Sequence, residues 1–331
     1  MEQETQDHRD NSDLVAALIR AAGRRTEPPE DAYRQVLNAA TDAFRKKSAK
    51  RRERTWLMWA AAAGIAAFAI ALMLQWEPPA AQRAPIASIE RPIGAVEQAT
   101  GDVWSPLGEA TVAFTRGTKI RTLAGGMAGL KLEGGASLRL AADTEIMLDT
   151  PPHLYLQRGT IYLDNRRNVG TGYRIETPAG TARDVGTQFE LKVAGKALRL
   201  RVREGRVEID RAGGRVTGTA GEQLDLDLLG GVARTPIAAT DIAWQWAESV
   251  APAPEIDGQP ASVLLAWVAR ETGRQLHYES SAVEARAASV ILHGNIRHLA
   301  PMAALDVMLA TTDLEYMLVG DTMEVRVRTE L

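Results

Sequence analysis

The 331-residue chain contains no cysteine, and this absence excludes several kinds of site. The chain can form no disulfide bond, offers no thiolate nucleophile and has no cysteine-based metal site. Any exported part must therefore be held together by its hydrophobic cores alone. The formal net charge is only -3, so no overall electrostatic field favours nucleic acid as a partner.

The motifs that commonly carry catalysis or bind cofactors are also missing. There is no G-x-S-x-G elbow, no P-loop and no protein-kinase motif. Gly170-Thr171-Gly172 is too short for a dinucleotide-binding loop, and Asp225 and Asp227 are expected on an exposed strand. No metal-binding spacing joins the histidines, which are His8, His153, His277, His293 and His298. We therefore expect a protein with no enzymatic activity, no cofactor and no metal ion.

One long stretch of the chain, Trp56 to Trp76, is almost free of polar residues. Its length matches the roughly 20 apolar residues that a helix needs to cross about 30 Å of hydrocarbon, and tryptophans stand near both ends. Seven basic residues lie between Arg45 and Arg54, whereas the next basic residue after the stretch is Arg83. Because basic flanks stay in the cytoplasm, the sequence predicts a transmembrane helix over 55–76 with its N-terminus inside.

Two alternatives to a membrane anchor are less consistent with this stretch. A cleaved signal peptide would place its apolar core within the first 15–30 residues, whereas 55 residues precede Trp56. A buried core helix would be shorter and would carry a polar face. We therefore expect a single-pass protein of the bacterial inner membrane, with residues 1–54 cytoplasmic and the C-terminal portion periplasmic.

The cytoplasmic arm, residues 1–54, contains two short stretches with apolar residues at helical spacing. Gly23 and Pro28-Pro29 separate them. Two such helices bury too little surface to be stable alone. They either pack on each other or dimerise, or they present their apolar faces to a cytoplasmic partner. The candidate partner-binding residues are Leu14, Leu18, Ile19, Tyr33, Leu37 and Phe44.

After a Pro- and Ala-rich segment, expected to be a linker over 77–92, the pattern changes to many short strands. Glycines punctuate alternating apolar and polar residues over 93–212, which predicts an all-β domain, sandwich-like or solenoid-like. Residues 213–254 are expected to be transitional strands and linker, with Trp244 and Trp246 serving core packing or domain docking. The expected strands include Lys119–Thr122, Ser137–Leu140, Glu145–Leu148, Leu154–Gln157, Thr160–Asp164, Tyr173–Thr177, Gln188–Val193, Leu198–Val202 and Arg206–Ile209.

The C-terminal part, residues 255–331, contains an internal repeat. Trp267–Tyr278 parallels Val307–Tyr316: each has an apolar helix end, a turn and then a Leu-x-Tyr strand. Gly258 and Gly294 stand at corresponding positions before the two helices. The repeat predicts a small α/β domain of two strand–helix–strand units.

Within the β-rich region, a run of residues resembles the FecR family of transmembrane signal regulators. The similarity covers about Gly94–Asp210, and its most specific part is YRIETPAGTARDVGTQFELKV followed by LRLRVREGRVEID. The glycines are expected at turns with positive φ and Phe189 in the core, so these are structural residues rather than ligands. The family positions in this chain are Thr177, Pro178, Gly180, Gly186, Thr187, Phe189, Glu204 and Gly205.

This resemblance implies a function for the whole chain. FecR-like regulators are anti-sigma factors, so the arm would bind an extracytoplasmic-function sigma factor. The periplasmic portion would receive a signal from a TonB-dependent outer-membrane receptor, which links such systems to the regulation of iron transport. The C-terminal repeat also resembles the short N-terminal domain of secretins and TonB-dependent receptors. The alternative is an envelope protein whose β-rich domain binds glycan or another envelope protein.

Overall fold

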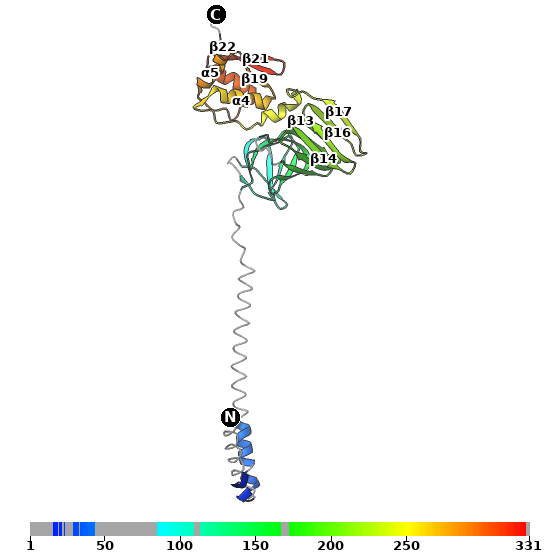
Figure 1. The fold of residues 1–331 in the computed structure, drawn as a ribbon, viewed down its shortest axis with the longest axis vertical. Helices are drawn as coiled ribbons and strands as arrows, with labels where there is room; N and C mark the ends of the chain where they lie inside the picture. Colours follow the sequence, from blue (N-terminus) through cyan, green and yellow to red (C-terminus); the bar gives the residue numbers. More distant parts are fainter. Residues whose placement is uncertain are drawn as a thin grey trace, which may run out of the picture. The chain divides into compact units, whose positions relative to one another are not determined.

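The computed structural model describes residues 85–108, 113–166 and 172–328, together with 16–18, 20, 21, 23, 29–32 and 34–43 in the arm (Figure 1). The chain forms two compact units, Met1–Ala81 and Gln82–Leu331. Residues 16–18, 20–21, 30–32 and 34–43 of the first unit are helical, as the arm's periodicity predicts. In these described parts of the chain no helix is long and apolar enough to cross a membrane. The predicted transmembrane segment 55–76 lies outside the described residues.

The second unit begins with an all-β domain in which one 17-stranded sheet curls into two layers. The first layer contains β1 (Ala87–Ile93), β4 (Ala113–Phe114), β6 (Met127–Leu132), β7 (Ser137–Leu140), β12 (Gln188–Ala194), β13 (Ala197–Glu204), β16 (Glu222–Leu226) and β17 (Val232–Pro236). The second layer contains β2 (Val96–Thr100), β3 (Val103–Pro106), β5 (Lys119–Thr122), β8 (Glu145–Leu148), β10 (Arg174–Thr177), β11 (Gly180–Asp184), β14 (Arg206–Arg211) and β15 (Gly214–Thr219).

The long strand β9 (His153–Asp164) joins the two layers. Its first half pairs with β8 and β10, and its second half pairs with β7 and β12. The strand bends near Gly159, whose φ is 92° and whose missing side chain would overlap the backbone of Thr144. The sequence predicted two strands separated at Gly159. The glycine instead lets one strand change layers, because only glycine fits this φ and this close approach.

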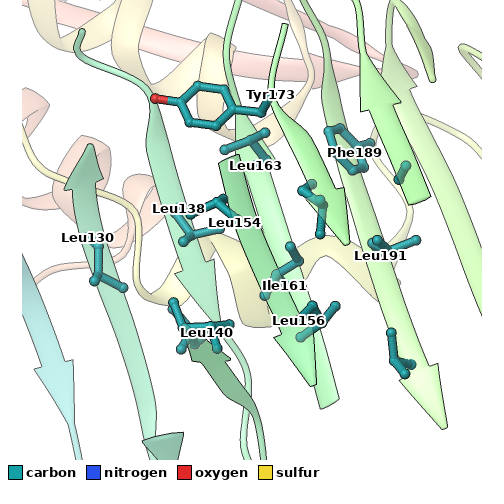
Figure 2. Close-up of a cluster of buried hydrophobic side chains, with 14 of the residues drawn as sticks. Leu130, Leu138, Leu140, Leu154, Leu156, Ile161, Leu163, Tyr173, Phe189 and Leu191 are labelled. Atoms are coloured by element: carbon teal, nitrogen blue, oxygen red, sulfur yellow. The ribbon is translucent and has the colours of Figure 1, made fainter. Parts of the chain in front are cut away.

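The space between the layers is filled by one apolar core. It draws on both layers, with Ile120, Ile146 and Ile175 from the second facing Leu138 and Phe189 from the first. Figure 2 labels side chains of this core on neighbouring strands, together with Tyr173 just before β10: Leu130, Leu138, Leu140, Leu154, Leu156, Ile161, Leu163, Phe189 and Leu191. The predicted all-β domain is therefore confirmed, and of the two expected architectures it has the sandwich-like one.

The boundaries of this domain differ from those expected. Residues 87–92, assigned to the linker, form most of β1, which pairs with β6 and buries Ala87 and Ile89. The sequence did not reveal this strand because the segment is rich in Pro and Ala. The strand tolerates Pro92 because this residue lies near its end, beyond a bulge between Ile89 and Arg91. Three strands beyond residue 212, β15 to β17, extend the same sheet to Pro236.

The C-terminal part contains the two predicted helices, α4 (Ala261–Thr272) and α6 (Pro301–Leu309), each preceded and followed by a strand. The leading strands β18 (Gln259–Pro260) and β20 (Ile291–Leu292) pair with each other. The following strands β19 (Gln275–Tyr278) and β21 (Leu314–Val319) lie on either side of β22 (Thr322–Val327). The two strands of each strand–helix–strand repeat therefore belong to two different sheets.

One helix and one strand of this domain were not predicted. Helix α5 (Ser281–Ser289) begins at the N-cap Ser280, whose hydroxyl accepts a hydrogen bond from the amide of Val283. This helix was not predicted because its sequence lacks a clear apolar stripe, and only Val283 and Ala287 are buried. The central strand β22 was missed because it follows the second repeat.

Candidate functional site

The candidate site is the junction between the β-sandwich and the C-terminal α/β domain, because a fully buried ion pair and a charged cleft lie there. The connecting segment contains a 3-10 turn, η1 (Ile242–Trp244), and a short helix, α3 (Gln245–Ser249). The Trp244 ring is fully buried and meets Tyr162 edge-on, with ring centres 6.0 Å apart. The indole Nε1 of Trp246 donates to Glu190 Oε2 at 2.8 Å. Both tryptophans thus pack the connecting segment against the sandwich, within the expected range of core packing or domain docking, and they lie on helical backbone.

A buried ion pair lies at the centre of the junction. Arg139 on β7 and Glu271 on α4 are both 0% exposed, and Arg139 Nη2 donates to Glu271 Oε2 at 2.5 Å. Arg139 Nη1 donates to the carbonyl of Ala247 at 3.0 Å, and its guanidinium lies 4.8 Å from the centre of the Tyr162 ring. Arg139 thus joins the sandwich, α3 and α4 at one point.

A second arginine, Arg203 on β13, holds the same three elements. Its Nε donates to Ala239 O at 2.6 Å, its Nη1 to the backbone oxygen of Glu271 at 2.7 Å and its Nη2 to Glu248 Oε1 at 2.8 Å. Helix α4 ends beside this arginine at Gly273, with φ 68°. A side chain there would come within 2.6 Å of Arg203 Nε, so the close fit of the helix end requires glycine.

The charges of the junction balance each other. Burial alone would lower the pKa of Arg139, but the charge and hydrogen bond of Glu271, together with Tyr162 and Asp164, outweigh this effect and raise the pKa. Burial raises the pKa of the Tyr162 hydroxyl, which has no hydrogen-bond partner among the described residues. The guanidinium of Arg139 therefore stays charged in a dry environment. Removing either member of such a pair typically costs about 3–5 kcal/mol, because the other charge is left uncompensated.

A cleft of about 560 Å³ opens beside the ion pair, between the sandwich and α4. Glu90, Lys131, Asp164 and Arg270 give it charges of both signs, and Trp267 forms an apolar wall. Burial raises the pKa of Glu90, while nearby Lys131 opposes this shift. Across the described residues, no group of histidines and carboxylates could hold a metal ion. The contacts of Arg139 and Arg203 hold the two domains together at this junction.

The first group of family positions forms the hairpin between β10 and β11. The Thr177 hydroxyl donates to Gly180 O at 2.7 Å and accepts from the Ala179 amide at 3.1 Å, with Pro178 between them. Gly180 has φ 144°, and a side chain there would lie 2.7 Å from Asp210 O. These residues shape a turn, as predicted. Gly180 and Gly186 belong to two different turns, because strand β11 separates them.

The second group surrounds the buried carboxylate of Asp184. This carboxylate accepts hydrogen bonds from Asn165 Nδ2 at 3.1 Å, from the Thr187 hydroxyl at 3.3 Å and from the Tyr173 amide. Burial raises its pKa, and these hydrogen bonds oppose the shift. Asp184 therefore ties the end of β9 to both ends of the β10–β11 hairpin.

The remaining family positions support the turns around this network. Gly186 has φ 65°, and Phe189 is fully buried in the core as predicted. A side chain at Gly205 would lie 2.6 Å from Thr187 Cγ2, so the β13–β14 turn packs directly on Thr187. Glu204 is ion-paired with Arg166. All of these contacts lie within the fold.

The predicted partner-binding residues of the arm are only partly described. Leu18 and Leu37 lie on helical backbone and are 63% and 52% exposed. Val36, which was not predicted, is 70% exposed beside Leu37. Leu14, Ile19, Tyr33 and Phe44 lie outside the described residues. The two described leucines are therefore available for contact with another protein.

Sequence reasoning missed the residues at the centre of the junction. Arg139 stands in the alternating segment SLRL, where its position predicts an outward-facing and hydrated side chain. It does face out of the sandwich, but α3 and α4 cover it. Glu271 lies near the end of an amphipathic helix, and nothing in its spacing connects it with Arg139, 132 residues away.

Comparisons with known proteins agree with the motif in the second half of the sandwich. Two crystal structures of a "putative anti-sigma factor" from Parabacteroides distasonis ATCC 8503, at 2.50 and 1.65 Å resolution, are 16% identical and cover 64% of this chain and 99% of their own. Their TM-score against this chain is 0.36. No curated protein matches the sequence. Residues 118–208, however, match the family described as "FecR protein". We conclude that this part of the chain is a FecR-family domain.

Proposed function

We propose that the chain is an anti-sigma factor that spans the inner membrane once and carries a signal from the periplasm to a cytoplasmic sigma factor. The FecR-family match over residues 118–208 is the observation that carries this proposal. The uncharged stretch Trp56–Trp76 and the basic residues before it supply the membrane anchor and its orientation. The protein acts by binding at both ends and catalyses no reaction.

The cytoplasmic arm binds an extracytoplasmic-function sigma factor through its apolar helix faces. The exposure of Leu18 and Leu37 supports this role, because exposed aliphatic side chains on short amphipathic helices are typical docking elements. Burying a leucine at an interface is worth about 1.5–3 kcal/mol, so replacing one by a charged residue should weaken binding at least about tenfold.

Copurification of sigma factors with the full-length protein tests this proposal. Leu18→Asp and Leu37→Asp should each lower the yield of copurified sigma factor. The matched controls are Ala17→Asp and Asn38→Asp, which add the same charge one position away on each helix. If no sigma factor of the host copurifies with the unaltered protein, the arm is only an anchor and the envelope-binding alternative is favoured.

The C-terminal domain receives the signal by binding the periplasmic signalling domain of a TonB-dependent receptor. Strand β21 supports this role because it lies at the edge of its three-stranded sheet and exposes Met317, Leu318 and Val319. An apolar edge strand can pair with a strand of another protein. The junction then passes the docking event to the sandwich, which follows the proposed membrane anchor in the sequence.

Binding assays with the signalling domains of the host's receptors check this receiver surface. Met317→Asp and Val319→Asp should lower the affinity at least about tenfold, because each puts a charge at the proposed interface. Val327→Asp is the matched control, since Val327 is also partly exposed but lies on the central strand β22. Equal effects of all three substitutions would move the receptor contact away from β21.

A further inference from the structure

The cleft beside the buried ion pair continues into a second hollow. The cleft itself has a volume of about 560 Å³, and the second hollow, between β1 and residues 252–255, has about 380 Å³. Glu90, Lys131, Pro252 and Ala253 line both of them. Pockets that bind small molecules typically measure about 300–1,000 Å³. The two hollows therefore form one groove, large enough for a ligand, with Glu90 and Lys131 at its centre.

Only two of the charged side chains at this centre are left without a partner. Asp164, Arg270 and Arg297 also line the groove, but each of them is ion-paired within the protein. Glu90 and Lys131 form no ion pair and no side-chain hydrogen bond with any residue that the structure describes. The charge of Lys131 reaches Glu90, since it opposes the rise in the pKa of that carboxyl group. The groove thus presents one available carboxylate and one available ammonium group.

A β-bulge brings these opposite charges together. Lys131 on β6 lies opposite Ser88 on β1. Further along β1, Ile89 and Arg91 have partners on β6, and Glu90 is the extra residue between them. A bulge redirects a side chain that regular pairing would place elsewhere. Glu90 therefore faces the groove beside Lys131 and takes no part in the pairing of the strands.

The opposite wall of the groove is apolar and stiff. Helix α4 contributes Val263 and Ala266, with the ring of Trp267 behind them, and the connecting segment contributes Pro252 and Pro254. The indole Nε1 of Trp267 donates to the carbonyl of Pro252 at 3.0 Å. Because each proline also fixes its own φ, this wall has little freedom to move.

Two further contacts hold the walls in place. Arg91 on β1 donates to the carbonyls of His298 and Leu299, just before α6, at 2.8 and 2.9 Å. A side chain at Gly129 on β6 would lie 2.5 Å from the carbonyl oxygen of Val250, so the connecting segment lies directly on this strand. The groove is therefore formed before any ligand binds, which lowers the entropic cost of binding.

We propose that this groove binds a short apolar peptide with free ends, its ammonium group at Glu90, its carboxylate at Lys131 and an aliphatic side chain against Pro254 and Val263. Both ends then make charge-assisted hydrogen bonds, and the side chain leaves water for an apolar wall. A ligand with only one charge would leave Glu90 or Lys131 unpaired. The site rests on these contacts alone and is independent of the proposed regulatory function.

Isothermal titration calorimetry of the full-length protein in detergent, with trileucine as the probe, tests the site. Acetyl-trileucine lacks the ammonium group and trileucine amide lacks the carboxylate. Each should bind at least about tenfold more weakly than trileucine, because each loses a charge-assisted hydrogen bond. Free leucine carries the same two charges and should also bind more weakly, since it covers less of the wall. Equal or tighter binding of leucine would overturn the peptide and assign the groove to free amino acids.

Variants of the two charged residues show which end each of them holds. Glu90→Gln should weaken the binding of trileucine at least about tenfold and leave that of acetyl-trileucine unchanged, because the deleted partners belong to the same contact. Lys131→Met should weaken trileucine in the same way and leave trileucine amide unchanged. The matched controls are Glu133→Gln and Lys192→Met, which remove the same charges from exposed side chains outside both hollows and should change nothing.

Two results would contradict the proposal. Trileucine with both ends blocked, if it bound as tightly as trileucine itself, would exclude recognition of the two charges. Neither heat nor thermal stabilisation with any of the probes would overturn the site altogether, because a ligand that binds the folded protein must stabilise it. Copurification of a sigma factor would stand or fall separately from both results.

Discussion

At the scale of single residues, one carboxylate explains the part of the family motif that follows strand β11. Asp184 is surrounded by Asn165, Thr187 and the Tyr173 amide, with no cation in its hydrogen-bond shell among the described residues. The motif therefore encodes a buried polar network in which each member satisfies another. A network of this kind specifies one arrangement of the hairpin, because any partly satisfied alternative leaves a buried polar group unpaired.

Asp184→Asn should reveal the raised pKa of this carboxyl group. The new side-chain amide would direct its own N–H donor toward the groups that now donate to the carboxylate. This should lower the free energy of unfolding by about 1–3 kcal/mol. Because the pKa of Asp184 is higher in the folded than in the unfolded protein, its contribution is fully present below the unfolded pKa of about 3.9 and is lost as pH rises through the folded pKa. The stability difference between wild type and variant should therefore shrink as pH rises through this window.

Denaturant unfolding of both proteins at several pH values between about 3 and 7 measures this difference. Other carboxylates contribute to acid stability with the opposite sign, since arginine and backbone donors lower the pKa values of Asp210 and Glu222. They cancel in the comparison because both proteins contain them. A difference that grows with rising pH would mean that the hydrogen bonds, and not burial, set the pKa of Asp184.

At the scale of secondary-structure elements, strand β9 determines the two-layer architecture. Its two halves belong to different layers, and the change occurs beside Gly159, where there is no room for a side chain. Gly159→Ala combines an unfavourable φ with a backbone overlap, so we expect a loss of at least about 2–3 kcal/mol in the free energy of unfolding. Thermal or denaturant unfolding of the full-length protein provides the measurement.

Gly135→Ala separates the two causes of this loss. Gly135 has φ 89°, close to the 92° of Gly159, but a side chain there would meet no atom within 4 Å. Its substitution measures the cost of the backbone conformation alone, which is about 1–2 kcal/mol for a left-handed residue. Equal losses for the two variants would show that Thr144 moves aside and that the close approach is not what fixes the bend.

The sequence predicts elements better than it predicts their connections. Strands β5, β7 and β8 have the predicted bounds because alternation with a buried face is a local signal. Strand β1 was assigned to the linker because proline lowers strand propensity, whereas its pairing with β6 depends on residues about 40 positions away. The ion pair of Arg139 and Glu271 cannot be predicted from the sequence for the same reason, since only docking of the two domains brings these residues together.

At the scale of the whole molecule, the junction decides whether docking at the C-terminal domain can act on the sandwich. Arg139 and Arg203 bind both the connecting segment and α4, so a displacement of α4 must carry part of the sandwich with it or break buried charge contacts. Coupling of this kind passes through a packed interface with few alternative arrangements. The proposed route from receptor to membrane anchor therefore depends on the contacts of these two arginines.

Arg139→Ala or Glu271→Ala should each prevent transmission of the signal from the C-terminal domain to the sandwich. The C-terminal domain should still bind the receptor, and the arm should still bind the sigma factor. Each leaves an uncompensated buried charge, which should weaken docking of the two domains by about 3–5 kcal/mol. We expect a sigma-dependent reporter to lose its response to the receptor signal, while copurification of the sigma factor stays unchanged. Faster hydrogen exchange in α3 and at the end of α4 would show that the junction itself has opened.

The double variant Arg139→Met with Glu271→Met tests whether the charges or only the contact matter. Two apolar side chains of similar length can replace a buried ion pair at little cost or with a gain in stability, so the domains should stay docked. If transmission needs only a rigid connection, this variant should restore the response that either single alanine substitution removes. A docked double variant that stays silent would instead require the ion pair to separate during signalling, because a permanently closed apolar contact would then block the signal.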